Sequence, residues 1–163
     1  MWRPILKTLI FTVVVPGTVT ILVPRWLLSS RRPADLPPWL RFAAWPLLLL
    51  GLAIYLWCAW DFASAGRGTP APIDPPKSLV VRGLYRHVRN PMYLGILAIL
   101  VGEALLAQSR ALLEYAAVIF GCFFLFVLAY EEPALYEQFG ESYERYRQEV
   151  PRWIPRWHRA RKK

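Results

Sequence analysis

Two short polar clusters in this chain stand where apolar runs begin and end. Residues 89–95 (Arg-Asn-Pro-Met-Tyr-Leu-Gly) open one apolar run, and residues 130–133 (Tyr-Glu-Glu-Pro) close the next. Proline suits the first turn of a helix and Asn90 suits the N-cap, where free N–H groups can also hold an anion. Glu131 and Glu132 are expected at a helix C-terminus, where the helix dipole disfavours acids. A cationic ligand would turn that cost into binding, so the clusters predict a site.

The apolar runs that must position these clusters predict a membrane protein. Hydrophobic residues make up 56% of the chain, above the soluble norm of roughly 45–50%. They gather in four runs, namely residues 4–23, 39–60, 93–107 and 111–130. A spanning helix needs about 17–25 apolar residues, so we expect an all-α, multi-pass membrane bundle of four spans, with a fifth, partial span left open. The first run lacks a small-x-small cleavage site, and we expect a retained helix that bends at Pro16-Gly17.

The connections between the runs bring the two clusters together. Residues 108–110 are too few for anything but a helical hairpin, so the third and fourth runs must be antiparallel neighbours. The stretches 26–38 and 61–77 are rich in proline and are expected to be largely non-helical. With four spans, 15 of the 20 Lys and Arg residues lie on the side that carries both clusters. The positive-inside rule therefore places the site and both termini in the cytoplasm.

The chain after Pro133 predicts an amphipathic segment at the membrane interface. Its apolar and aromatic residues recur at positions 135, 136, 139, 143, 146 and 150, with charges between them. The basic tail, residues 153–163, should be attracted to anionic lipid headgroups, and we expect no nucleic-acid partner. The whole chain is interpreted as one domain, with a two-helix region at 1–60 and the motif region at 61–152. The oligomeric state is left open.

The remaining polar and sulfur-containing residues have structural interpretations. Cys58 and Cys122 lie inside apolar runs and are expected to be packing residues, and we expect no metal site. Glu103 and Glu114 flank the hairpin with Arg110 between them, and they are expected to form a helix-end ion pair with it.

The spaced motifs continue on both sides of the two clusters. Gly83-x-Tyr85 precedes them, and Phe139-Gly140, Tyr143, Tyr146 and Val150-Pro151 follow them. The whole set, over residues 50–152, resembles the isoprenylcysteine carboxyl methyltransferase superfamily, and within it phosphatidylethanolamine N-methyltransferase. The resemblance implies an integral-membrane methyltransferase that uses S-adenosylmethionine, with the cofactor pocket between helices on the cytosolic side.

The same resemblance assigns roles to residues by position. Cofactor contacts fall on Gly51, Lys77, Ser78, Leu79, Val80, Tyr85, Asn90, Pro91, Met92, Tyr93, Glu131 and Glu132. Gly51 is a half match, because the second glycine of the family's Gly-x-Gly is an alanine here. A lipid amine has a pKa of about 10 and must lose a proton, which Glu132 or His87 could accept as the catalytic base.

Two departures from the carboxyl methyltransferases bear on the methyl acceptor. Asn90 stands where those enzymes have histidine, and Val127 stands where they have an arginine, four residues before the acid pair. Both favour a membrane lipid or other hydrophobic acceptor, such as a phospholipid amine, over a prenylcysteine carboxylate. Isoprenylcysteine-type carboxyl O-methylation, an NADPH-dependent membrane reductase of the sterol type and a non-catalytic scaffold remain alternatives. The acid pair argues against the reductase, because it would repel a phosphorylated cofactor.

Overall fold

The computed structural model describes residues 10, 13–29, 36–62, 64 and 79–156 of the 163-residue chain. Every regular element in these residues is a helix, as the sequence predicts. In chain order they are η1 (Thr18–Leu22), α2 (Val23–Ser29), η2 (Pro38–Leu40), α3 (Arg41–Asp61), η4 (Gly83–Arg86), α4 (Pro91–Leu106), α5 (Arg110–Phe126), η5 (Val127–Glu131), α6 (Glu132–Phe139) and α7 (Glu141–Glu149). Residues 63 and 65–77 of the stretch expected to be rich in proline, and residues 157–163 of the basic tail, lie outside the described residues.

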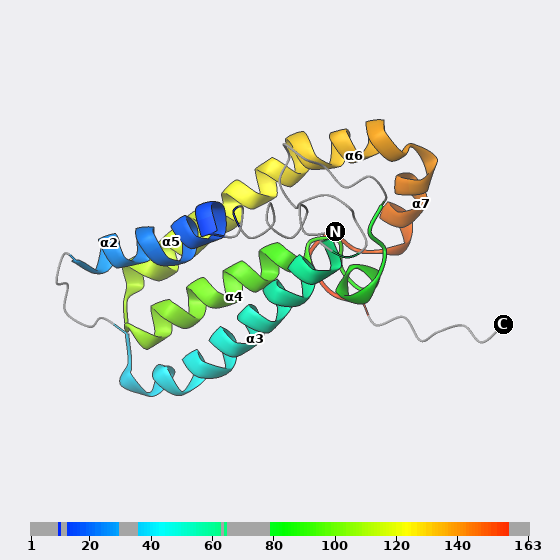
Figure 1. Cartoon of the computed structure of the whole chain (residues 1–163). Helices are drawn as coiled ribbons and strands as arrows, with labels where there is room; N and C mark the ends of the chain where they lie inside the picture. The colour runs from blue at the N-terminus through cyan, green and yellow to red at the C-terminus, as the bar shows by residue number, and fades with distance from the viewer. Residues whose placement is uncertain (1–9, 11–12, 30–35, 63, 65–78, 157–163) are drawn as a thin grey trace.

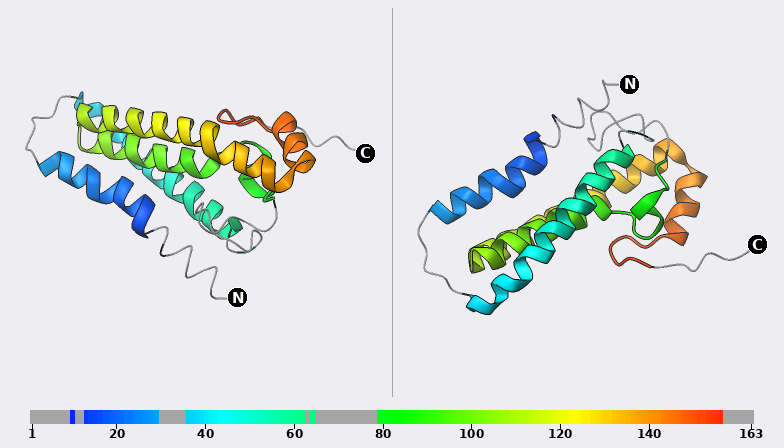
Figure 2. Two further views of the ribbon diagram at one scale, coloured as in Figure 1. Left: turned by 90° about the horizontal axis from the view of Figure 1, so that it is seen from above. Right: turned by 60° about the horizontal axis from the view of Figure 1, so that its bottom comes forward.

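The long helices run side by side, and the polar clusters meet at one end of them. In Figure 1, α6, α7 and the segment after them gather where α3 ends and α4 begins, and the α4–α5 hairpin lies at the opposite end. The turned views in Figure 2 show the same arrangement. The bundle therefore has a polar end, which carries the site, and a hairpin end.

The first helix (Val13–Ser29) is continuous through Pro16-Gly17, where a bend was predicted. Gly17 has helical angles, φ −63° and ψ −38°, and the irregular turn is the π-helical η1 that follows it. Pro24 explains this position, because its ring would clash with the carbonyl four residues earlier in an ordinary α-helix. The widened turn just before Pro24 relieves that clash.

Small residues let α3 and α4 approach closely. A Cβ atom built on Gly51 would lie 2.6 Å from the carbonyl oxygen of Gly95, and one built on Gly95 would lie 3.0 Å from the oxygen of Gly51. Two helical turns further along α4, a Cβ atom built on Gly102 would lie 3.2 Å from the carbonyl oxygen of Ala44. Close backbone approach at small residues is how helices associate in lipid, where the hydrophobic effect between helices is absent.

The predicted hairpin at residues 108–110 is confirmed. Ala107, Gln108 and Ser109 separate α4 from α5, and Gln108 turns the chain with a φ of 53°. The Ser109 hydroxyl caps α5 by accepting a hydrogen bond from the Leu112 amide at 3.4 Å. The two helices therefore return the chain to the polar end.

The expectation that Glu131 and Glu132 end a helix is wrong. The helix passes through both acids as the π-helical turn η5 and continues as α6 to Phe139. The prediction rested on Pro133, since a proline normally stops a helix. As at Pro24, the wide turn just before the proline makes room for its ring, so the helix survives.

In the described part of the chain, two helices are long and apolar enough to cross a membrane, and their surfaces suit one. They span Pro38–Asp61 and Arg110–Phe139, and Val13–Ser29 and Pro91–Leu106 are shorter apolar helices. Only 22% and 17% of the apolar windows of the two long helices are buried inside the protein. Large apolar side chains therefore face outward, including Phe42, Trp45, Leu49, Leu56, Val118 and Leu125. Contiguous exposed apolar surface of this kind marks a membrane or a partner.

Candidate active site

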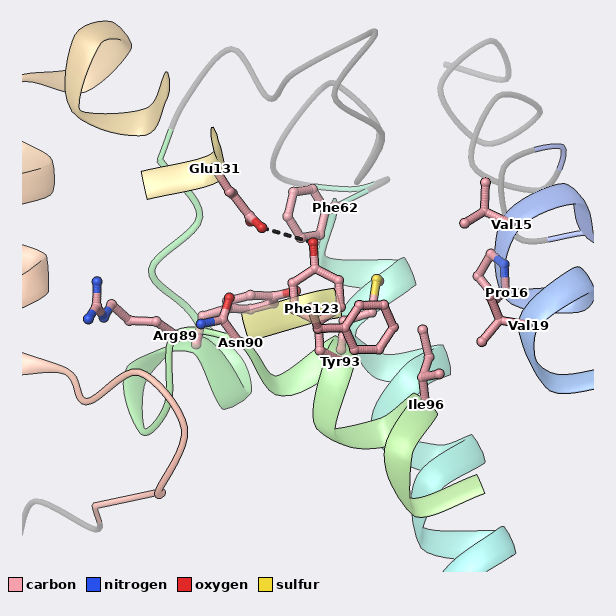
Figure 3. A pocket seen from close by; sticks show the side chains of 12 residues that line it. Val15, Pro16, Val19, Phe62, Arg89, Asn90, Tyr93, Ile96, Phe123 and Glu131 are labelled. Carbon is pink, nitrogen blue, oxygen red and sulfur yellow. Dashed lines mark hydrogen bonds between the residues drawn. The ribbon is translucent and has the colours of Figure 1, made fainter. Parts of the chain in front are cut away.

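The two polar clusters meet through one hydrogen bond. The hydroxyl of Tyr93, in the first turn of α4, donates to Oε2 of Glu131 in η5 at 2.8 Å (Figure 3). The hairpin makes this contact possible, because it brings the start of α4 beside the end of α5. A hydrogen bond to a charged acceptor stabilises by about 1.5–3 kcal/mol, so the pair fixes both side chains.

Tyr93 and Glu131 form the polar part of an otherwise apolar cavity of about 80 Å³. The described lining residues are Val15, Pro16, Val19, Phe62, Tyr85, Arg89, Asn90, Met92, Tyr93, Ile96, Phe123 and Glu131. Figure 3 shows the side chains from the first helix facing those of α4 and α5 across the cavity. The first helix therefore forms one wall of the cavity, and the polar groups lie on the opposite side.

Aromatic rings hold Tyr93 in place. Its ring centroid lies 4.5 Å from that of Phe123 on α5 and 6.4 Å from that of Trp153 after α7. Trp153 also packs edge-on against Phe120, with centroids 5.4 Å apart. These contacts join three parts of the chain around one hydroxyl group, whose direction the packing fixes.

Glu132 has quite different partners from its neighbour Glu131. Arg89 donates to Oε1 of Glu132 at 2.8 Å, and Arg152 donates to Oε1 at 2.6 Å and to Oε2 at 2.8 Å. The side chains of Arg89 and Glu132 are each only 9% exposed. The hydrogen bonds with Glu132 also raise the pKa of Arg152. This cluster of two arginines and one acid carries a net positive charge and ties α4, α6 and the C-terminal segment together.

The C-terminal segment is tied to the residues that precede α4. The backbone N–H of Arg89 donates to the carbonyl of Pro151 at 2.9 Å, and the N–H of Arg156 donates to the carbonyl of His87 at 3.0 Å. Nearby, the Tyr146 hydroxyl donates to the backbone oxygen of Tyr85 at 2.7 Å. Burial raises the pKa of Tyr146, so this phenol stays protonated and remains a donor.

Asn90 does not cap α4 in the way the sequence suggests. Its side chain makes no capping bond, and Nδ2 instead donates to the carbonyl of Arg152 at 3.1 Å. The backbone N–H groups at the start of α4 are therefore left without a side-chain cap beside the cavity. Uncapped N–H groups of this kind, with the helix dipole behind them, suit an anionic group.

A sequence comparison identifies the family. The sequence model of the phospholipid methyltransferase family matches residues 39–142, which run from the start of α3 into α7 and include both clusters. The chain belongs to the phospholipid methyltransferase family.

Two curated proteins are similar to this member of the family. Protein-S-isoprenylcysteine O-methyltransferase of Schizosaccharomyces pombe is 35% identical over 77 residues, and protein-S-isoprenylcysteine O-methyltransferase B of Arabidopsis thaliana is 36% identical over 78 residues. Each match covers 47% of this chain, but only 33% and 39% of the two relatives. The chain thus matches well under half of the length of either relative.

The structure brings some of the predicted cofactor residues together and separates others. Tyr85, Asn90, Met92, Tyr93 and Glu131 line the cavity. The other described residues are not among those that line the cavity. Pro91 is buried, Leu79 and Val80 pack in hydrophobic clusters, and Gly51 contacts α4. The two predicted proton acceptors, Glu132 and His87, do not line it either. Lys77 and Ser78 lie outside the described residues.

Sequence reasoning missed the apolar walls of the cavity. Ile96 could have been found, because it follows Tyr93 by one helical turn and so shares its face. Arg89 belongs to the first cluster, but its place in the wall was not predicted. Phe62, Phe123 and the residues of the first helix carry no such signal, because only the packing of distant segments places them there.

Proposed function

We propose that the protein is an S-adenosylmethionine-dependent methyltransferase that acts on a membrane lipid or another hydrophobic acceptor. The observation that carries this proposal is the Tyr93–Glu131 pair at the inner end of an apolar cavity, in a member of the phospholipid methyltransferase family. Family membership supports the reaction class, and the residues of the cavity support the place where it occurs.

The chemistry of the cavity fits the parts of the cofactor. The Glu131 carboxylate can accept hydrogen bonds from an ammonium group, and the uncapped start of α4 can receive a carboxylate. The rings of Phe62, Tyr85 and Phe123 offer faces to a sulfonium and to an adenine. When bound, S-adenosylmethionine supplies an electrophilic methyl group. The cavity of about 80 Å³ is smaller than the roughly 300–1,000 Å³ of typical ligand sites, so we expect the first helix to move outward on binding.

The protein's own residues would then orient the reacting groups and exclude water from them. Tyr93 holds the Glu131 carboxylate at a fixed angle, and the apolar walls exclude water. Methyl transfer needs an in-line approach, so orientation and desolvation supply much of the rate.

The proton acceptor remains a prediction. Glu132 is bound by Arg89 and Arg152, an arrangement that favours a positioning role for its carboxylate over proton transfer. His87 is joined to the C-terminal segment through its backbone oxygen. We therefore expect Glu132→Gln to disturb the arrangement of the site, and His87→Gln to slow turnover only if this imidazole accepts the proton.

We further propose that four helices cross the membrane, with the polar end and both termini in the cytoplasm. The outward apolar surface and the excess of Lys and Arg on one side support this arrangement. It places α6 and α7 at the cytoplasmic interface and leaves the cavity open toward lipid beside the first helix. The basic tail would then meet anionic headgroups.

The acceptor is proposed to be a phospholipid amine. Val127, at the position where carboxyl methyltransferases carry an arginine, is only 1% exposed within η5, so it offers no charge to a substrate carboxylate. Carboxyl O-methylation of the isoprenylcysteine type is the second candidate, because both curated relatives bear that name. Radiolabelled methyl transfer to a total lipid extract and to a prenylcysteine would separate the two by the labelled product.

Cofactor binding tests the site directly. Isothermal titration of the detergent-purified protein should show binding of S-adenosylhomocysteine, with NADPH as a negative control. Glu131→Gln should weaken binding about tenfold or more, since it removes the proposed charge-assisted hydrogen bond to the ligand ammonium, worth about 1.5–3 kcal/mol. Tyr93→Phe should also weaken binding, because it releases the Glu131 carboxylate from its fixed position. Glu137→Gln and Tyr130→Phe are matched controls at exposed positions and should bind normally. Wild-type protein that is folded and binds no S-adenosylhomocysteine would sink the proposal.

A further inference from the structure

A second cavity lies near the hairpin end of the bundle, away from the proposed active site. Its volume is about 290 Å³, and it lies between the first helix and the last turns of α4. The described lining residues are Thr20, Ile21, Pro24, Arg25, Leu28, Glu103, Leu106 and Ala107. Glu103 follows Pro91 by twelve residues, which is about 18 Å along the helix.

The Glu103 carboxylate is the unusual feature of this cavity. Its Oε2 atom is buried and has no hydrogen-bond partner among the described residues. Of the two acids that the sequence suggested as partners of Arg110, Glu114 forms the ion pair, at 3.1 Å. A buried carboxylate oxygen without a hydrogen-bond partner is costly, so a cationic group that reaches it would bind favourably.

Arg25 supplies the opposite charge in the same cavity. Its side chain lines the wall, but the described residues show no ion pair within 4.0 Å between Arg25 and Glu103. The wall of the cavity thus carries an acidic side chain and an exposed basic side chain that do not form an ion pair with each other. Most of the remaining lining is apolar, so a ligand needs a cationic group, an anionic group and an apolar body.

We propose that this cavity binds the headgroup of a zwitterionic phospholipid that carries a primary amine. The ammonium group, with its three N–H donors, would meet Glu103, and the phosphate would meet Arg25. Ile21, Leu28 and Leu106 would contact the glycerol and upper acyl chain. This lipid is separate from a methyl acceptor, since its site lies at the opposite end of α4. It would be a structural lipid, bound to the bundle without being methylated.

Lipid binding to the delipidated, full-length protein in detergent tests the proposal. The probes are phosphatidylethanolamine, phosphatidylcholine and phosphatidylglycerol with identical acyl chains, and the readouts are bound lipid by native mass spectrometry and lipid-dependent thermal stabilisation. Phosphatidylethanolamine should stabilise most, because the trimethylammonium of phosphatidylcholine has no N–H donor and phosphatidylglycerol has no cation.

Single substitutions then locate the lipid. Glu103→Gln and Arg25→Gln should each weaken phosphatidylethanolamine binding tenfold or more, whereas Glu114→Gln, at the exposed acid of the same hairpin, should not change it. Affinity for S-adenosylhomocysteine should be the same in Glu103→Gln as in the wild type. Phosphatidylethanolamine that binds as the proposed methyl acceptor is retained in Glu103→Gln, so the loss that this variant causes reports on the second cavity alone.

Three outcomes would overturn the proposal. Unchanged phosphatidylethanolamine binding in Glu103→Gln would remove the acid from the site. Equal stabilisation by phosphatidylglycerol would show an anion site at Arg25 alone. A loss of lipid-free stability in both single variants that the double variant restores would indicate a direct Arg25–Glu103 ion pair. If Glu103→Gln does not fold, Arg25→Gln alone decides by the same measurements.

Discussion

Two glycines of the bundle are predicted to respond in opposite ways to the same substitution. A Cβ atom on Gly51 would lie 2.6 Å from the backbone oxygen of Gly95 and 2.9 Å from Cγ1 of Ile99. A Cβ atom on Gly121, in α5, would meet nothing within 4 Å. Gly51→Ala must push α3 and α4 apart, and Gly121→Ala needs no movement.

The size of the difference follows from the two environments. Alanine is favoured over glycine inside a helix by about 1 kcal/mol, and this gain is common to both variants. Overpacking costs about 1–3 kcal/mol, and a backbone oxygen cannot rotate away from the new methyl group as a side chain can. We therefore expect Gly121→Ala to be stabilised by about 1 kcal/mol and Gly51→Ala to lie about 1–3 kcal/mol below it. At about 2–4 °C per kcal/mol, the melting temperatures should differ by roughly 2–12 °C.

The assay is thermal unfolding of both variants in the same lipid nanodisc, together with S-adenosylhomocysteine binding. Gly51→Ala should also bind less tightly, because Gly95 lies two residues after Tyr93 and a wider helix pair displaces that hydroxyl. Equal melting temperatures for the two variants would refute the packing argument. A normal melting temperature with lost binding would instead make Gly51 a cofactor contact, as the family resemblance suggested.

Three further substitutions test contacts around the site. Glu132→Gln leaves Arg89 and Arg152 without a counter-charge. It should lower the free energy of unfolding, measured by denaturant titration, by about 3–5 kcal/mol. A loss below about 1 kcal/mol would contradict a buried ion cluster. Tyr146→Phe leaves the backbone oxygen of Tyr85 without its donor and should cost about 1–3 kcal/mol in the same titration, and an unchanged midpoint would show that another group satisfies it. Ser109→Ala removes the cap of α5 and should cost about 0.5–2 kcal/mol, whereas Ser142→Ala, at an exposed hydroxyl, should cost less.

Local signals in the sequence were sufficient to predict that the two clusters lie close together. The short hairpin at 108–110 required antiparallel neighbours, and so Tyr93 and Glu131 had to meet. Other features depend on segments that are distant in sequence. The return of Trp153 to the ring of Tyr93 joins residues sixty positions apart, and no local pattern predicts such a contact.

The acid pair shows why helix rules alone failed at this site. Pro133 is a normal stop signal, and a helix that ended there would have left both acids at its C-terminus. The wide turn η5 removes the steric reason for stopping. The same pattern, a π-helical turn followed two residues later by a proline, occurs at Pro24 in the first helix.

The wide turn at η5 also determines the direction in which the side chains of α6 point around the helix axis. Each residue of an α-helix turns the chain by about 100°, so a turn that holds one more residue shifts all later side chains around the axis. Deleting Ala129, whose side chain is exposed, would rotate Glu131 and Glu132 together relative to α5. Glu131 could then no longer contact Tyr93 while Glu132 contacts Arg89 and Arg152. The site depends on the number of residues in this turn as much as on their identity.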